Sequence, residues 1–160
     1  MSILSRLAAV VAVLPLAAAQ CPFSSLSVQS AGASCNLQPT GCCAIVSGPT
    51  QLNATLAVTP CALDLEVPAI EGCCGVAVPA RLLVLGDAPT AVPLPNFGPS
   101  CTLWVLPGVA LVLTLGDRFT LPIPPALPPI TFLAQAAAIH TSPFGPPVVT
   151  FTEAKALSLR

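Results

Sequence analysis

Charged residues are scarce in this 160-residue chain. Asp, Glu, Lys and Arg make up 7% of it, and there is one histidine and no tyrosine. Ordinary soluble domains contain about 25% charged residues. Five basic residues against six acidic ones do not form the positive stripe that neutralises phosphates, so nucleic acid is excluded as an expected partner.

Residues with catalytic potential are equally sparse. A serine or cysteine nucleophile needs a positioned base, and the sole histidine, His140, is followed by Thr141-Ser142-Pro143, which is typical of a strand that ends in a loop. We therefore expect His140 to be an exposed, structural residue. No G-x-S-x-G motif is present. Asp64 and Glu66 would lie about 7 Å apart on one strand face, where a solvated outer face explains them better than a glycosidase pair.

Metal and cofactor sites are not predicted either. Zinc needs three or four N, S or O ligands, which one histidine and oxidised cysteines do not supply. Asp87 and Asp117 each follow a glycine, as is typical of turns. Calcium bound by loop carboxylates remains an alternative, although no Asp-rich spacing supports it. Asn53 begins a glycosylation sequon, which matters where the source glycosylates by that route. We expect no catalytic, cofactor or metal residues, and hence no enzyme.

Helix signals are almost absent, because 20 prolines and 10 glycines interrupt nearly every stretch of ten residues. Short alternating segments predict strands instead. In the segment 62–67, Leu63, Leu65 and Val67 share one face, and Asp64 and Glu66 share the other. The expected fold is all-β, an antiparallel β-sandwich of eight or nine short strands with a disulfide-rich N-terminal half. The candidate strands are 51–59, 62–67, 81–85, 101–106, 109–115, 119–123, 130–137, 148–151 and 155–159.

Three local features refine this prediction. Residues 115–119 (Leu-Gly-Asp-Arg-Phe) are expected to form a hairpin turn between two strands. Residues 121–129 are too rich in proline for a central strand, which favours an edge strand that continues into a polyproline-like crossover. Trp104, between Leu103 and Val105, is expected to anchor the core beside a disulfide; a ligand-stacking platform is the alternative.

The N-terminus has the layout of a secretory signal peptide. Residues 1–6 carry one positive charge, an apolar stretch of about ten residues follows, and Ala17-Ala18-Ala19 provides a cleavage site. The apolar stretch is shorter than the roughly 20 residues that span a bilayer. We expect residues 1–19 to be removed and 20–160 to form a single secreted β domain without a membrane span. Lipidation at Cys21 and an uncleaved anchor are the alternatives.

All eight cysteines lie after the predicted cleavage site: Cys21, Cys35, Cys42, Cys43, Cys61, Cys73, Cys74 and Cys101. An even number in an exported chain predicts four disulfides, with a metal–thiolate cluster as the alternative. Their pairing is open, since eight cysteines allow 105 connectivities. Adjacent cysteines bridge poorly, so each Cys-Cys pair is expected to send its bonds to two different places. Residues 21–101 are thus the cysteine-rich part, and 102–160 are cysteine-free strands.

Hydrophobic residues make up 54% of the chain, more than a domain of this size can bury. Apolar surface of this kind often marks contact with proteins, membranes or a matrix. The leading hypothesis is a secreted, non-enzymatic structural or interaction protein, extracellular or periplasmic, whose partners would be other envelope or extracellular proteins or glycans. A small ligand- or glycan-binding module, with Trp104 and the loop 93–100 as its site, is the alternative.

The second half of the chain resembles uncharacterised small secreted domains of planctomycete-type bacteria, over about residues 81–160. This resemblance implies a β-sandwich and export, and it brings no active site. The residues that carry it are Leu83-Val84-Leu85-Gly86, Pro93-Leu94-Pro95, Gly98-Pro99-Ser100-Cys101-Thr102-Leu103, Leu121-Pro122-Ile123-Pro124, Thr131-Phe132-Leu133-Ala134-Gln135-Ala136 and Ala156-Leu157-Ser158-Leu159.

The doubled cysteines, the apolar bias and the secretion signal also resemble the hydrophobins, small fungal proteins that act at surfaces. Their cysteine order is single, pair, single, single, pair, single, whereas this chain has single, single, pair, single, pair, single. A further 59 residues follow Cys101 here, whereas hydrophobins end soon after their last cysteine. This resemblance implies a surface-active protein.

Overall fold

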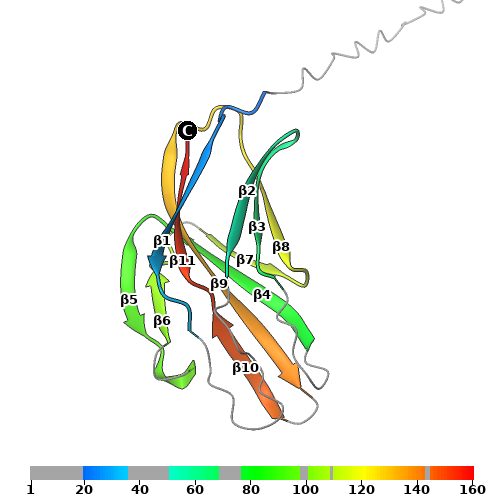
Figure 1. Ribbon diagram of the computed structural model, residues 1–160, viewed down its shortest axis with the longest axis vertical. Coiled ribbons are helices and arrows are strands. Elements are labelled where there is room, and N and C mark those ends of the chain that lie inside the picture. Colours follow the sequence, from blue (N-terminus) through cyan, green and yellow to red (C-terminus); the bar gives the residue numbers. More distant parts are fainter. Residues whose placement is uncertain (1–19, 36–50, 69–76, 98–100, 109, 143–144) are drawn as a thin grey trace, which may run out of the picture.

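The computed structural model describes residues 20–35, 51–68, 77–97, 101–108, 110–142 and 145–160 (Figure 1). Within these residues the chain forms antiparallel strands and one 3-10 turn, η1 (Pro95–Phe97), which confirms the all-β class. None of them forms a helix long and apolar enough to cross a bilayer. The strands are β1 (Leu26–Gly32), β2 (Asn53–Val58), β3 (Cys61–Glu66), β4 (Ala77–Gly86), β5 (Pro89–Pro93), β6 (Thr102–Val105), β7 (Ala110–Thr114), β8 (Arg118–Pro122), β9 (Ile130–Ser142), β10 (Gly145–Phe151) and β11 (Ala154–Leu159).

All nine predicted strands are present, and β1 and β5 are two that the sequence pattern did not predict. Neither has an apolar face that alternates clearly. Five of the seven residues of β1 are exposed, and β5 begins and ends with proline. Pairing with β11 holds β1 in place, and pairing across a hairpin with β6 holds β5; neither leaves a clear signal in the strand's own sequence.

The larger sheet has the order β1-β11-β9-β4-β7, and β10 also pairs with β9. The 13-residue β9 is its central element. β11 pairs with the first half of β9 and β10 with the second half along one edge, while β4 pairs along the other edge. β7 therefore closes one side of this sheet as an edge strand.

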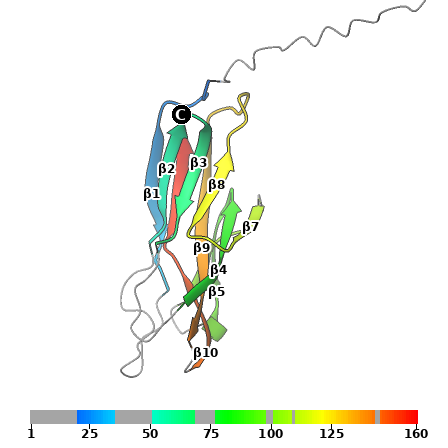
Figure 2. The same ribbon diagram turned by 90° about the vertical axis from the view of Figure 1, so that its right-hand side faces the viewer.

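The smaller sheet, with the order β2-β3-β8, packs against one face of the larger sheet. Figure 2 shows β3 and β8 in one layer with β9 behind them. The alternation predicted for β3 is confirmed, because Leu63 and Leu65 are buried and Asp64 and Glu66 are partly exposed. The core between the two sheets contains Phe23, Leu52, Leu63, Leu65, Val67, Leu83, Leu85, Phe119, Ile123, Ala134, Ala136, Leu157 and Leu159.

The β5–β6 hairpin forms a third, smaller layer on the opposite face of the larger sheet, away from β8 in Figure 1. Val105 of this hairpin is fully buried against Val84 of β4 and Ala154 of β11. The larger sheet is therefore covered on both faces over part of its area.

Two disulfides join parts of the chain that are distant in sequence. Cys21 bonds to Cys61 at the start of β3, with Cα atoms 4.9 Å apart. Cys35 bonds to Cys101, just before β6, with Cα atoms 4.7 Å apart. Half of the cysteines predicted to form disulfides are thus confirmed. The predictions for Cys42, Cys43, Cys73 and Cys74, and for the signal peptide at 1–19, fall outside the described residues.

The segment 115–119 does not form the hairpin turn that we predicted. β7 pairs with β4 in the larger sheet, and β8 pairs with β3 in the smaller sheet, so this segment crosses from one sheet to the other. A glycine-containing turn between two apolar strands can have the same local sequence whether it joins strands of one sheet in a hairpin or leads from one sheet to the other. Which sheet each strand joins depends on its distant partners.

Candidate functional site

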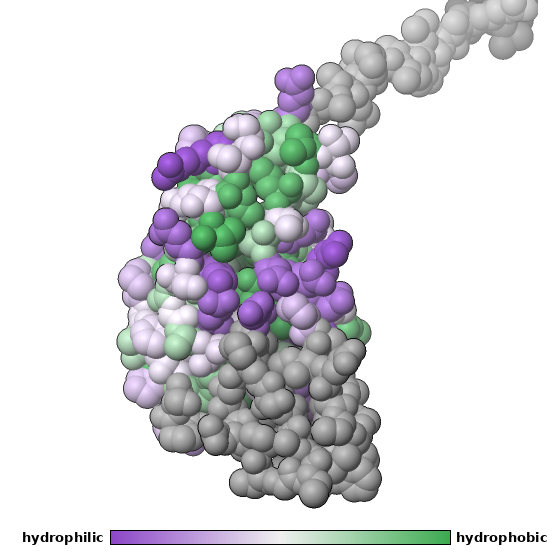
Figure 3. Space-filling model, in the orientation of Figure 1, coloured by the Kyte–Doolittle hydropathy of each residue, from purple (hydrophilic) through white to green (hydrophobic). Residues whose placement is uncertain are grey.

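A cavity of about 340 Å³ lies at one end of the sandwich, where the crossover from β8 to β9 passes between the sheets. We call it the inter-sheet cleft. It lies at the end of the molecule where β2 and β3 turn and β11 finishes, and Figure 3 shows hydrophobic residues gathered at this end. Its lining consists of Leu63, Leu85, Asp87, Leu121, Pro122, Ile123, Pro124, Leu127, Ile130, Thr131, Phe132 and Leu159.

The two sheets fail to close on each other at this end. Ile130 pairs with Leu159 and lies on the same face of β9 as the buried Ala134, yet its side chain is 39% exposed. Phe132 is also only partly buried on this face. An inward-facing isoleucine that stays exposed indicates that the cleft is open to solvent, whereas Leu63 and Leu159 close its floor.

The rim of the cleft is a short, proline-rich segment. The amide of Ile123 donates to the carbonyl oxygen of Cys61 at 3.1 Å, and the amide of Leu127 donates to Pro124 at 3.1 Å. Four prolines at 124, 125, 128 and 129 restrict the backbone further. The predicted edge strand is confirmed, since β8 is an edge strand and 123–129 connect it to the other sheet. The crossover is not polyproline-like throughout, because a turn closed by the Leu127–Pro124 bond interrupts it. The rim of the inter-sheet cleft is therefore a backbone segment that can adopt few conformations.

Asp87 is the one charged residue in this lining. It follows Gly86 in a bend just beyond the end of β4. A β-carbon on Gly86 would overlap the backbone of Leu106, so glycine is required where β6 ends against β4. Asp87 is exposed, which places its carboxylate at the mouth of the cleft.

A second feature is the free edge of β7, which we call the β7 edge. The outward-facing Leu111 and Leu113 are 62% and 65% exposed, and Leu115 just beyond the strand is 79% exposed. Val112 and Ala110 face the core on the other side of the strand. β7 pairs with β4 in regular register, and none of the described residues pairs with its other edge. Figure 2 shows β7 at the margin of the molecule with no described strand outside it.

No family model, curated protein or solved structure matches this chain.

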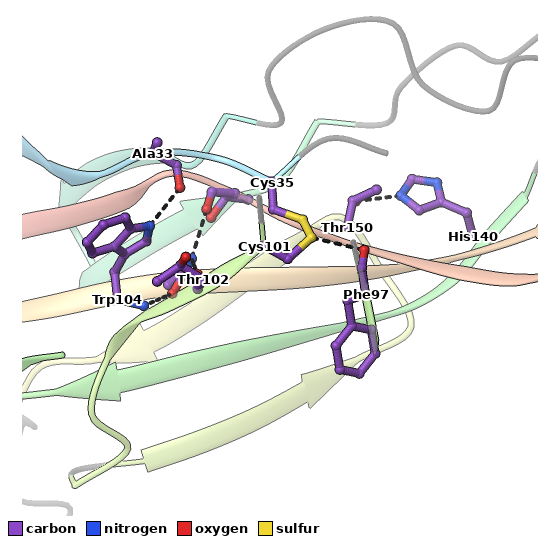
Figure 4. Close-up of a disulfide and its surroundings, with 10 residues drawn as sticks. Ala33, Cys35, Phe97, Cys101, Thr102, Trp104, His140 and Thr150 are labelled. Atoms are coloured by element: carbon purple, nitrogen blue, oxygen red, sulfur yellow. Dashed lines mark hydrogen bonds between the residues drawn. A yellow bond between two sulfur atoms is a disulfide. The ribbon is translucent and has the colours of Figure 1, made fainter. Parts of the chain in front are cut away.

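Trp104 is half-buried and packs in the cluster that joins the β5–β6 hairpin to the larger sheet. Its Nε1 donates to the carbonyl oxygen of Ala33 at 3.0 Å, and its ring lies directly against Gly32. Figure 4 shows the indole near the Cys35–Cys101 disulfide. The indole packs near a disulfide as predicted, but it is half-buried at the edge of a small cluster and does not belong to the main core.

Gln135 of β9, which the sequence did not mark, is fully buried and fixes the same hairpin. Its Oε1 accepts from the backbone amide of Trp104 at 2.8 Å, and its Nε2 donates to the carbonyl oxygens of Thr102 at 3.2 Å and Thr152 at 3.1 Å. A glutamine flanked by apolar residues in a predicted strand was the signal that could have found it.

The prediction that His140 is exposed is wrong: its side chain is 1% exposed. β9 continues to Ser142 instead of ending at Ala137, so His140 lies inside the strand on the same face as Ala136 and Ala138. Its Nε2 lies 2.8 Å from Oγ1 of Thr150. Burial, and next the nearby charge of Arg81, lower the pKa of His140.

Arg81 is also buried, at 4% exposure, and donates from Nη1 to the carbonyl oxygen of Gly116 at 2.8 Å. It ties β4 to the segment that crosses between the sheets. Neither Nε of Arg81 nor Nδ1 of His140 has a hydrogen-bond partner in the described part of the molecule. No described carboxylate lies in hydrogen-bond contact with either side chain.

The other predicted surface residues are dispersed. Asp64 accepts from Oγ1 of Thr120 at 2.6 Å on the outer face of the smaller sheet. Asp117 lies in the segment between β7 and β8, and the exposed Asn53 begins β2. Among the described residues, no three His, Cys, Asp or Glu side chains gather as a metal site would require.

Proposed function

We propose that this protein is a secreted, non-enzymatic structural protein of the extracellular space or cell envelope, which associates through the β7 edge. The observation that carries the proposal is an edge strand that no described residue pairs on its outer side, with exposed Leu111 and Leu113 and, just beyond it, exposed Leu115. The export signal and the resemblance to secreted bacterial domains support the location, and two disulfides within the described chain suit an oxidising compartment.

Most edge strands carry features that block pairing with another chain, such as proline, charge or a bulge. β1 has a register irregularity between Ser30 and Gly32, and β5, β8 and β10 contain proline. β7 has the sequence Ala-Leu-Val-Leu-Thr, with no charge, proline or irregularity. The edge strand β2 also has no charge, proline or irregularity, but its exposed residues are Asn53, Thr55 and Val58. β7 exposes leucines instead, so it is the edge that gains most by adding a strand.

The occupant that this edge fits best is a second copy of the same chain. An antiparallel strand can pair with its own copy about a two-fold axis, and the same residues then serve both sides. With the axis at Val112, Leu111 of each copy would lie opposite Leu113 of the other. The four leucines would then contact one another in cross-strand pairs on one face, and an uncharged strand does not repel its copy. A five-residue edge buries less than the roughly 1,000 Å² of a stable interface, so we expect a weak dimer.

Sedimentation equilibrium of the secreted protein tests this proposal. We expect a dimer that dissociates on dilution in the micromolar range, and a monomer at every concentration for the double variant Leu111→Lys/Leu113→Lys. Val58→Lys is the matched control, since Val58 is 59% exposed on a strand of the other sheet, and this variant should dimerise as wild type does. A wild-type protein that stays monomeric at millimolar concentration would overturn the proposed dimer.

Fractionation of the source tests the location. Wild type should be recovered partly in the envelope or matrix fraction, and the double lysine variant should shift into the medium. If wild type and the double lysine variant distribute equally between the fractions, the β7 edge does not hold the protein in the envelope, and that part of the proposal is overturned.

A second function, small-ligand binding, is favoured by the inter-sheet cleft. Ligand sites are concave and mostly apolar, with volumes of about 300–1,000 Å³ and a few polar groups. The cleft, at about 340 Å³ with one carboxylate, falls at the lower end of that range. The cleft thus replaces the region of Trp104 as the candidate ligand site, because the indole is engaged in packing.

A further inference from the structure

We propose that the inter-sheet cleft binds amphiphilic amines, with the alkyl chain between the sheets and the cationic amine at Asp87. This inference rests on the ligand-binding function proposed for the cleft. It adds the chemical class of the ligand, and it follows from the size of the cleft, its apolar walls and its single charge.

The volume sets the size of the ligand. If each heavy atom takes about the 30 Å³ that a water molecule occupies in the liquid, a cleft of about 340 Å³ holds on the order of ten heavy atoms. A linear alkyl chain of about ten carbons matches this volume. Larger ring systems would have to part the two sheets.

The walls favour hydrocarbon over polar ligands. Ten of the twelve lining residues are Leu, Ile, Pro or Phe. Of the two polar residues, Thr131 already shares a hydrogen bond with Ser158, at 2.8 Å between their hydroxyl oxygens. A sugar would leave its hydroxyls without partners against such walls, at a cost of about 1–3 kcal/mol for each buried group. Covering Ile130 and Phe132, which face the cleft, would in contrast be favourable.

The charge at the mouth selects the headgroup. Asp87 is the one ionisable side chain of the lining, and the salt bridge found in the described part of the molecule lies elsewhere, between Lys155 and Glu153. Its carboxylate is therefore free to accept hydrogen bonds from an ammonium group. An anionic headgroup would meet repulsion at the same position, so the cleft discriminates by charge as well as by polarity.

The site is largely preformed. The crossover at its rim is held by the bonds of Ile123 to Cys61 and of Leu127 to Pro124, and four prolines stiffen it. A rigid rim reduces the entropy that is lost when a flexible chain enters. The nearby Cys21–Cys61 disulfide also anchors the start of β3 at this end.

Methyl NMR of isoleucine-labelled protein tests the proposal with an internal control. Ile123 and Ile130 line the cleft, whereas Ile139 lies toward the other end of β9. Titration with decylamine should shift the Ile123 and Ile130 methyl signals saturably and leave Ile139 unchanged. Decanol and decanoate are the matched probes, with the same chain and a neutral or anionic headgroup. We expect decylamine to bind about fivefold more tightly than decanol, and decanoate to bind more weakly than both.

Two variants and a control for each separate the contribution of the charge from that of the apolar walls. Asp87→Asn should bring decylamine and decanol to equal affinity, whereas Asp117→Asn, in the segment between the sheets, should leave the preference intact. Leu127→Trp should fill the cleft and abolish binding of all three probes. Val28→Trp, on the exposed face of β1, should bind as wild type does.

The titrations distinguish failure of the cleft as a ligand site from failure of its proposed preference for amines. If decanol and decylamine bind equally to wild type, the cleft is a ligand site but the amine inference is overturned. If no probe shifts Ile123 or Ile130, both the cleft function and the amine inference fall. If Ile139 shifts together with the other two, binding is non-specific, which also overturns the inference. The wild-type titration decides these outcomes even where a variant does not fold.

Discussion

The indole ring of Trp104 packs directly on the backbone of Gly32, with no side chain between them. A β-carbon at Gly32 would overlap Cγ, Cδ1 and Cδ2 of the ring. The same ring reaches Ala33 through the bond from its Nε1. This contact joins the end of β1 to the β5–β6 hairpin, and the Cys35–Cys101 disulfide joins the same two segments a few residues further on.

Gly32→Ala should therefore destabilise the protein by about 1–3 kcal/mol, since overpacking forces the ring or the strand to move. Urea unfolding followed by fluorescence measures the change, and the signal is specific because Trp104 is the sole tryptophan. Gly116→Ala is the control. The nearest atom to its new β-carbon lies 3.7 Å away, so a change below about 0.5 kcal/mol is expected. Equal effects of both substitutions would contradict the packing argument.

Gln135→Met should loosen the β5–β6 hairpin while the rest of the larger sheet stays folded. The methionine fills a similar volume but leaves the amide of Trp104 and two carbonyl oxygens without the partners they have now. A buried unpaired group costs about 1–3 kcal/mol.

Hydrogen exchange measures this loosening at the Trp104 amide, which should exchange faster in Gln135→Met than in wild type. Gln29→Met is the matched control, because Gln29 is exposed on β1. Unchanged exchange at Trp104 in the Gln135 variant would show that the hairpin is held by apolar packing alone.

Removing the Cys35–Cys101 disulfide, as Cys35→Ala with Cys101→Ala, should cost about 4 kcal/mol. The bond closes a loop with a sequence separation of 66 residues. A disulfide lowers the conformational entropy of the unfolded chain, and it does so more when the loop that it closes is longer. Cys21→Ala with Cys61→Ala, with a separation of 40 residues, should cost slightly less, because the entropy grows with the logarithm of loop length. Chemical unfolding under oxidising conditions measures both. A loss below about 1 kcal/mol for the first pair would contradict this prediction.

The stability of the protein should fall between neutral pH and mildly acidic pH because of His140. Its pKa is lowered in the folded state, so the unfolded chain binds the proton more tightly. The stabilisation is complete above the ordinary histidine pKa of about 6.5. It is lost as the pH falls from there toward the folded-state pKa, by up to about 1.4 kcal/mol per pH unit.

Urea midpoints at pH 7.5 and 5.5 check this dependence. His140→Gln keeps a group that can bond to Thr150 but does not titrate, so its two midpoints should be closer together than those of wild type. If wild type and the variant lose stability equally between these pH values, other groups cause the loss.

Local sequence patterns were enough to predict nine of the eleven strands in the described residues, because alternation and proline placement act within a few residues of each other. The missed strands, β1 and β5, depend on partners at the far end of the chain or across a hairpin. The prediction for His140 failed for a related reason: β4 and β10 extend the pairing of β9 beyond Ala137 and cover a residue that the local pattern placed in a loop.

The amino-acid sequence by itself determined the all-β class, the oxidised state expected of the cysteines and the absence of a legible catalytic motif, since these follow from composition and short-range pattern. The tertiary structure decided which strands share a sheet and which cysteines meet in the two disulfides of the described chain. It also decided that apolar residues far apart in sequence enclose a cleft beside Asp87, and that β7 lies at the edge of its sheet among the described strands. The physical reason is that strand pairing and core packing join residues tens of positions apart. Which residues meet therefore depends on the fold of the whole chain and not on any local segment.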